Sequence, residues 1–81
     1  MWYIYIVNCA DNTLYTGVTT DIERRVFAHN SLKSGAKYTR ARQPVQVVYK
    51  KIYPSKKEAM QEEWRIKQLS RKEKLVLIKS I

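Results

Sequence analysis

The stretch that decides the fold spans residues 3–29 and reads YIYIVNCADNTLYTGVTTDIERRVFAH. It begins with a run of aromatic and β-branched residues, which predicts a half-buried strand. Asp and Asn within residues 10–13 tolerate left-handed backbone conformations and indicate a hairpin turn. A second strand over residues 14–18 and a helix beginning at Thr20 or Asp21 complete a strand–turn–strand–helix unit.

Alternation along the first strand divides its side chains between two faces. Tyr5 is expected on the face opposite Ile4 and Ile6. In the second strand, Tyr15 and Gly17 share a face. Because Gly17 has no side chain, it leaves room for another group to approach.

The helix carries two polar residues next to its apolar stripe. At about 100° per residue, Ile22, Arg25, Val26 and His29 lie within one face roughly 100° wide. Ile22 and Val26 must pack against the sheet, so Arg25 and His29 are brought towards it. An arginine in that position is costly unless it is paired. It could extend to solvent or pair with a core carboxylate, and the helix alone leaves both alternatives open.

A polar, basic connection follows over residues 30–43. It places Lys33, Lys37, Arg40 and Arg42 around one aromatic residue, Tyr38. Basic residues interleaved with an aromatic ring suit a phosphate backbone with one unstacked base. A solvated loop is the alternative.

The rest of the chain predicts a strand and two helices. Pro44 precedes a third strand over residues 45–53. Two capping boxes, at residues 55–58 and 70–73, begin a helix that runs to about Leu69 and a short last helix. The last helix is expected to be anchored by Leu75, Val76 and Ile78.

Glu63 is the carboxylate of interest in the longer helix. One face of that helix carries Ala59, Met60, Glu63 and Ile66, so Glu63 is expected among apolar neighbours. An i,i+4 pair with Lys67 would contribute only a few tenths of a kcal/mol, less than the cost of burying the charge. Metal ligation or pairing with Arg25 explains the position better. Glu62, on the other side of Ile66, is a weaker candidate.

Composition restricts the class of protein. The chain has 81 residues and no repeat, which predicts a single domain over residues 1–81. One cysteine excludes an internal disulfide, and no signal peptide or membrane span is present, so a cytoplasmic protein is expected. The formal charge of +9 favours a polyanionic partner.

Several spaced motifs resemble one known family. Residues 3–5 (YIY), residues 15–17 (YTG), Arg25 and His29 together resemble the GIY-YIG nuclease superfamily. Residues 35–42 and 63–70 are similar to its small stand-alone bacterial branch (UPF0213-like), so the resemblance covers nearly the whole chain. Tyr3 stands where the family has its first glycine, and Thr16 replaces the isoleucine of the second motif. Neither position carries chemistry in the family.

The resemblance implies an α+β fold, in which a three-stranded antiparallel sheet is flanked by three helices. It also implies an endonuclease that depends on a divalent metal, Mg²⁺ or Mn²⁺, and hydrolyses phosphodiester bonds in DNA. No module for reading a long target follows in this sequence. Selectivity for branched, flap or single-stranded DNA, with a role in repair or recombination, is therefore expected.

The resemblance also implies roles for five residues. Tyr5 would activate the attacking water, Tyr15 would relay a proton or position a group, and Arg25 would neutralise developing charge. His29 would orient the tyrosine or shuttle a proton, and Glu63 would bind the metal. Because an ordinary tyrosine has a pKa of about 10, forming phenolate at pH 7 costs about 4 kcal/mol.

Two competing functions belong to other classes. The chain could be a nucleic-acid-binding module without cleavage activity, or an accessory subunit of a repair enzyme with a protein partner that supplies the substrate. The motifs do not distinguish DNA from RNA.

Overall fold

The computed structural model describes residues 1–30 and 43–79. Within them the chain forms β1 (Trp2–Asn8), β2 (Leu14–Thr19), α1 (Ile22–His29), β3 (Gln46–Tyr53), α3 (Lys56–Lys67) and α4 (Arg71–Lys79). The strands form one antiparallel sheet in the order β2-β1-β3. The predicted α+β class, with three helices flanking a three-stranded antiparallel sheet, is confirmed.

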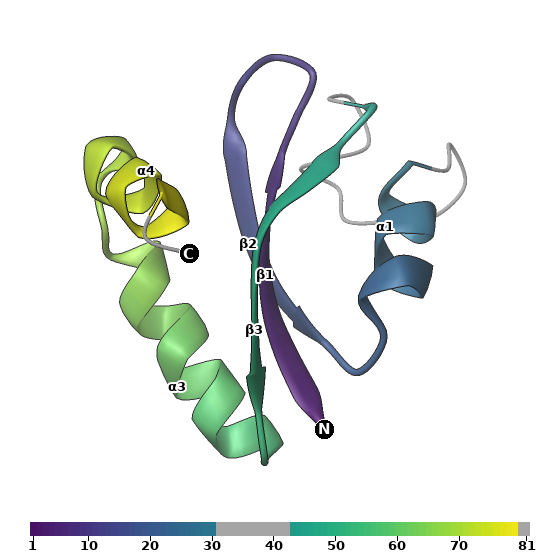
Figure 1. Ribbon diagram of the computed structural model, residues 1–81, viewed down its shortest axis with the longest axis vertical. Coiled ribbons are helices and arrows are strands. Elements are labelled where there is room, and N and C mark those ends of the chain that lie inside the picture. The colour runs from purple at the N-terminus through teal and green to yellow at the C-terminus, as the bar shows by residue number, and fades with distance from the viewer. Residues whose placement is uncertain (31–42, 80–81) are drawn as a thin grey trace.

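The helices cover both faces of the sheet (Figure 1). α1 lies against one face, and α3 and α4 lie against the other. The alternation of β1 explains this division, because Ile4 and Ile6 pack with Tyr49 and Ile66 in the cluster under α3 and α4. Tyr5 faces the other way, into the cluster under α1.

The hairpin between β1 and β2 sets the register that matters for function. Asn12 adopts a left-handed conformation with φ of 65°, as the turn chemistry predicted. The Cys9 N–H donates to the Thr13 carbonyl oxygen at 2.8 Å. The resulting register places Tyr5 directly opposite Gly17.

The end of α1 is joined to the start of β3. The Val45 N–H donates to Asn30 Oδ1 at 2.7 Å, and Asn30 Nδ2 donates to the Val45 carbonyl oxygen at 3.3 Å. Val45 is therefore held by a side chain, and the strand ladder begins one residue later than predicted, at Gln46.

Each helix begins at a residue whose side chain caps it. Asp21 Oδ1 accepts from the Arg24 N–H at 3.1 Å, and Ser55 Oγ accepts from the Glu58 N–H at 3.3 Å. At the start of α4 the capping is reciprocal between Ser70 and Glu73. The predicted capping box at residues 70–73 is confirmed, whereas at residues 55–58 Ser55 caps the helix and Glu58 contacts the Ser55 hydroxyl rather than its N–H.

The ends and faces of α3 and α4 differ from the prediction. α3 ends at Lys67 rather than near Leu69. In α4 the side chains that pack on the core are Leu77 and Ile78, whereas Leu75 and Val76 are exposed. Choosing Leu75 and Val76 as anchors was wrong, because residues 74, 77 and 78 share the inner face of this helix.

None of the helices in the described ranges is both long and apolar enough to cross a membrane.

Candidate active site

Tyr5 lies at the centre of the site, on the face of β1 that is covered by α1. Its side chain is 1% exposed, and its hydroxyl oxygen lies 2.8 Å from His29 Nε2. The opposing residue must be glycine, because a Cβ at position 17 would lie only 2.5 Å from the Tyr5 hydroxyl oxygen. The prediction that Gly17 admits another group is confirmed, and that group is the Tyr5 phenol.

His29 is fully buried at the end of α1. Its ring meets the Tyr15 ring in an edge-on arrangement, with centroids 5.3 Å apart. Its carbonyl oxygen accepts from Gln43 Nε2 at 2.6 Å. Burial, together with the nearby positive charge of Arg25, lowers the pKa of His29 to about 4. The imidazole is therefore neutral at physiological pH.

Arg25 is partnered by tyrosine hydroxyls. Hydrogen bonding to Tyr5 is the main cause that raises the pKa of Arg25, and a hydrogen bond to Tyr15 contributes in the same direction. The helix pattern left open whether Arg25 would reach solvent or pair with a core carboxylate. Its guanidinium instead hydrogen-bonds to the two motif tyrosines, one on each strand of the hairpin.

The contacts of the Tyr5 hydroxyl combine an arginine and a histidine. A guanidinium can only donate, so the Tyr5 oxygen accepts from Arg25. The same oxygen lies 2.8 Å from His29 Nε2, and which of these two groups donates to the other depends on the tautomer of the neutral ring.

Burial makes the Tyr5 phenolate harder to form. It raises the pKa of Tyr5 above 10, and the hydrogen bond and charge of Arg25 offset only part of that rise. The Glu63 carboxylate also contributes to raising the pKa of Tyr5. Glu63 therefore lies within electrostatic range of Tyr5.

The two adjacent glutamates of α3 act on different parts of the sheet. Glu62 binds Arg65 one turn along the helix. Burial raises the pKa values of Tyr49 and Tyr53 in β3, and Glu62 adds to both rises. Glu63 acts on Tyr5, so of the two glutamates it is the one associated with the site formed by the hairpin and α1.

Glu63 is half-buried, and its Oε2 lies 3.6 Å from Lys67 Nζ. The local i,i+4 pair considered from the sequence therefore exists. Its expected apolar surroundings are only partly present: Ala59 and Ile66 are buried, but Met60 is 47% exposed, because it lies about 120° around the helix from Ile66.

The donor set fits a metal that binds few protein ligands. The described ranges contain no cluster of three or more His, Cys, Asp or Glu side chains that could hold a metal ion. Mg²⁺ is commonly bound by one or two carboxylates and substrate phosphate oxygens, and it keeps several waters. A single carboxylate such as Glu63 is compatible with that pattern. The described residues do not provide the several ligands of a site closed by protein groups.

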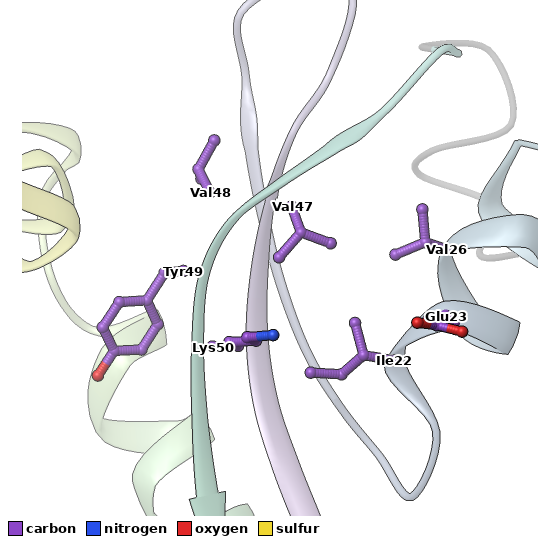
Figure 2. A pocket seen from close by; sticks show the side chains of 7 residues that line it. All are labelled: Ile22, Glu23, Val26, Val47, Val48, Tyr49 and Lys50. Atoms are coloured by element: carbon purple, nitrogen blue, oxygen red, sulfur yellow. The ribbon is translucent and has the colours of Figure 1, made fainter. Parts of the chain in front are cut away.

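Several hollows border α1, and one of them is lined by a site residue. This hollow, of about 280 Å³ beside Arg25, is lined by Thr19, Thr20, Asp21, Arg24, Arg25 and Ala28. A larger one, of about 610 Å³, lies between α1 and β3. Figure 2 shows Ile22 and Val26 facing Val47 across it. The larger hollow is mainly apolar and includes no cationic site residue, so the hollow beside Arg25 suits a phosphate group better.

Five residues predicted to contact nucleic acid lie outside the described residues: Lys33, Lys37, Tyr38, Arg40 and Arg42. Two positioning residues were not identified from the sequence. Gln43 binds the backbone of His29, and Asn30 binds that of Val45. A helix-ending Asn30 was a weak signal for such a role, and nothing in the sequence marked Gln43.

Comparison with known proteins identifies the family. The model of the GIY-YIG catalytic domain matches residues 1–75. A UPF0213 protein of Desulfotalea psychrophila is 52% identical over 79 residues, covering 98% of this chain and 72% of the relative. One from Staphylococcus haemolyticus is 54% identical over 76 residues, covering 94% and 92%. The solution NMR structure of a UPF0213 protein from Bacillus halodurans has a TM-score of 0.62 and 49% identity, covering 98% of this chain and 84% of that one.

The chain belongs to the GIY-YIG family, a nuclease superfamily, and its relatives carry the UPF0213 name. The predicted family and branch are confirmed. In this chain the two motif tyrosines, the arginine and the histidine converge between the hairpin and α1, and the α3 glutamate acts on the same tyrosine.

Proposed function

We propose that this protein is an endonuclease that depends on a divalent metal, Mg²⁺ or Mn²⁺, and hydrolyses phosphodiester bonds in DNA. One observation carries the proposal. The Tyr5 hydroxyl lies 2.8 Å from a buried, neutral His29 and is also bound by Arg25, within range of the Glu63 carboxylate. Core packing does not require such a convergence of polar groups.

Arg25 is suited to bind a phosphate and stabilise the charge that develops on its oxygens. Its guanidinium is held by Tyr5 and Tyr15, and Arg25 lines the hollow of about 280 Å³. A preorganised cation of this kind stabilises a transition state more effectively than a flexible one, because no reorganisation is needed during the reaction.

The water-activating role is assigned here to Tyr15, although the sequence interpretation gave it first to Tyr5. Tyr5 is almost fully buried, and burial raises its pKa, so forming its phenolate costs more than the about 4 kcal/mol of an ordinary tyrosine. Tyr15 is only half-buried and shares Arg25. In this assignment Tyr15 first loses its proton to solvent, and its phenolate oxygen then takes the proton of the attacking water, while the leaving oxygen takes a proton from solvent. Tyr5 and His29 hold Arg25 and the Tyr15 ring in place.

Glu63 would hold the metal. When bound, the metal would neutralise negative charge on the phosphate oxygens. Glu63 would have to give up its contact with Lys67, which costs little because exposed ion pairs contribute about 1 kcal/mol or less.

Selectivity for DNA structure, a role in repair or recombination, and a protein partner that supplies the substrate are further parts of the proposal. The alternative function is a nucleic-acid-binding module without cleavage activity. The contact between Glu63 and Lys67 favours this alternative, because it gives Glu63 a structural role that needs no metal.

Two variants of α3 test the metal role. Glu63→Gln keeps the volume and removes the charge, and Glu62→Gln is the matched control on the adjacent residue. We expect Glu63→Gln to abolish cleavage across a Mg²⁺ titration while DNA still binds, with an unchanged Tm in the absence of metal. A lower Tm with cleavage intact at saturating Mg²⁺ would leave Glu63 a structural residue.

The arginine assignment has its own control on another helix. Arg25→Ala should lower single-turnover cleavage by roughly 10²-fold or more, the size expected when one preorganised donor is lost, with little change in DNA affinity. Arg71→Ala removes the same charge from the exposed start of α4, away from the hollow beside Arg25, and should leave the rate almost unchanged. Loss of affinity with the rate retained would make Arg25 a backbone clamp.

The tyrosine roles are separated by comparing Tyr15→Phe with Tyr5→Phe. We expect Tyr15→Phe to lose more cleavage rate, since only that variant removes the oxygen that takes the proton. The opposite order would return the water-activating role to Tyr5.

A further inference from the structure

A large aromatic side chain next to the site is exposed without a structural reason. Trp64 follows Glu63 in α3 and is 68% exposed. Met60, one turn earlier, is 47% exposed, and residues four apart on a helix are neighbours. Together they form an apolar surface, which we call the Trp64 platform. Exposed indole and thioether groups side by side indicate a binding surface.

The Trp64 platform begins beside Glu63 and extends towards the solvent-facing side of α3. At about 100° per residue, Glu63, Lys67, Met60 and Trp64 follow one another within an arc of about 100°. The contact between Glu63 and Lys67, at 3.6 Å, is consistent with this arc. Glu62 and Arg65 lie on the other flank of the helix and bind each other. A group held at Glu63 would therefore have the Trp64 platform beside it.

The charge around the Trp64 platform indicates the kind of partner. Lys57 and Lys67 are exposed on the same side of α3, and the whole chain carries a formal charge of +9. An aromatic surface flanked by lysines matches a strand of nucleic acid, which offers a phosphate backbone to the lysines and a base to the ring. An acidic apolar peptide would be the competing occupant.

We infer that the Trp64 platform stacks one unpaired base of a single-stranded or flap segment whose backbone passes the proposed metal position at Glu63. This rests on the proposed function, because it takes the metal position from that site. Bases in a duplex are covered by their neighbours, whereas an unpaired base offers its face to an aromatic side chain. The platform therefore selects unpaired strands with little preference for base identity.

Tryptophan fluorescence tests the contact directly. The chain has two tryptophans, and Trp2 packs against the core. Trp2→Phe leaves Trp64 as the reporter, and Trp64→Phe leaves Trp2 as the control. With metal omitted, a single-stranded oligothymidylate should quench the Trp64 signal at saturation and leave the Trp2 signal unchanged, and a blunt duplex should quench neither. Equal quenching of Trp64 by strand and duplex would overturn the inference.

Affinity gives a second readout. Trp64→Ala should weaken binding of the single strand about tenfold and change duplex binding less than twofold, whereas Trp64→Phe should retain most of the single-strand affinity. Val76→Ala is the control, because Val76 is an apolar residue that is 64% exposed on α4 and should not affect either ligand. If Trp64→Ala keeps full single-strand affinity, the inference is wrong.

The two proposals fail in different measurements. Selective quenching of Trp64 with no cleavage in any metal would support the platform and refute the nuclease proposal. If cleavage depends on Glu63 but single-strand affinity does not depend on Trp64, the nuclease proposal is supported and the platform is refuted.

Discussion

Burial keeps both members of the Tyr5–His29 pair neutral. It raises the pKa of the phenol and lowers that of the imidazole to about 4. The hydrogen bond between them is therefore a neutral one over the whole physiological range, and the charges of the site come from Arg25 and Glu63. A rise of cleavage rate near pH 6.5, the ordinary range of histidine, is not expected from His29.

His29 should make stability depend on pH. Folded His29 binds a proton only near pH 4, whereas unfolded histidine does so near pH 6.5, so acid favours the unfolded state. The contribution of His29 to the free energy of unfolding is complete above pH 6.5 and is lost as pH falls towards 4. Because the two pKa values differ by about 2.5, this contribution is at most about 3 kcal/mol. Urea unfolding between pH 7 and 5 measures it. His29 is the chain's only histidine, so a His29→Gln variant should flatten the curve, and an equally steep curve would contradict the assignment.

The Gly17–Tyr5 contact predicts a coupled pair of substitutions. Gly17→Ala places a methyl group 2.5 Å from the Tyr5 hydroxyl oxygen and 2.7 Å from its ring carbon Cζ, so the ring must shift, at a cost of about 1–3 kcal/mol. The shift should also weaken the hydrogen bond to His29. A double-mutant cycle by denaturant unfolding measures the coupling: Tyr5→Phe should cost less stability when combined with Gly17→Ala than alone. Additive costs would show that the two residues do not constrain each other.

At the scale of elements, α1 is the part of the fold that assembles the site. It carries Arg25 and His29 to the hairpin, and both of its ends are fixed by side-chain hydrogen bonds. Asp21 caps its start, and Asn30 joins its end to Val45. Contacts within the helix are few because it is only 8 residues long. An isolated helix of this length is unstable in water, so these attachments and the sheet maintain it.

The cap of α1 can be tested without changing a site residue. Asp21→Ala removes the acceptor of the Arg24 N–H and should lower the free energy of unfolding by about 1 kcal/mol. Asp21→Asn retains an acceptor of similar capping strength and should cost much less. Chemical denaturation of the three proteins provides the comparison. Equal losses in both variants would mean that the charge of Asp21, rather than its hydrogen bond, supports the helix.

At the scale of the whole molecule, the charge of +9 should govern affinity for nucleic acid through counterion release. Each phosphate neutralised contributes about one unit to the slope of log affinity against log salt. The basic residues predicted to contact the backbone lie outside the described residues, so this contribution stays a prediction from sequence.

Lys37→Ala and Arg40→Ala should each flatten that slope by about one unit. Lys51→Ala is the control, because Lys51 is paired with Ile4 in the register and so lies on the face of the sheet away from the hairpin site, over the Tyr53 ring. Its slope should stay close to that of the unchanged protein. Binding titrations at several salt concentrations measure all three, and unchanged slopes in the first two variants would make the connection a solvated loop.

Local patterns predicted the elements and their faces well. Alternation in β1 separated Tyr5 from Ile4 and Ile6, the capping boxes marked the starts of α3 and α4, and helical periodicity placed Arg25 and His29 against the sheet. These succeeded because each depends on residues a few positions apart. Boundaries and anchors that depend on distant packing did not all follow: α3 ended early, Val45 stayed outside the ladder, and α4 packs Leu77 on the core in place of Leu75 and Val76, although Ile78 was predicted correctly.

The sequence by itself determined the α+β class, the family and the residue types of the candidate site, because motif spacing and side-chain periodicity are local properties. Only the tertiary structure decided how those residues are charged and paired. These contacts join segments far apart in the chain. Tyr5 contacts His29 at 2.8 Å, and Arg25 hydrogen-bonds to both motif tyrosines. Glu63 acts on Tyr5, whereas Glu62 acts on Tyr49. Burial, which changes the pKa values of Tyr5 and His29 in opposite directions, exists only once the sheet and α1 have packed together.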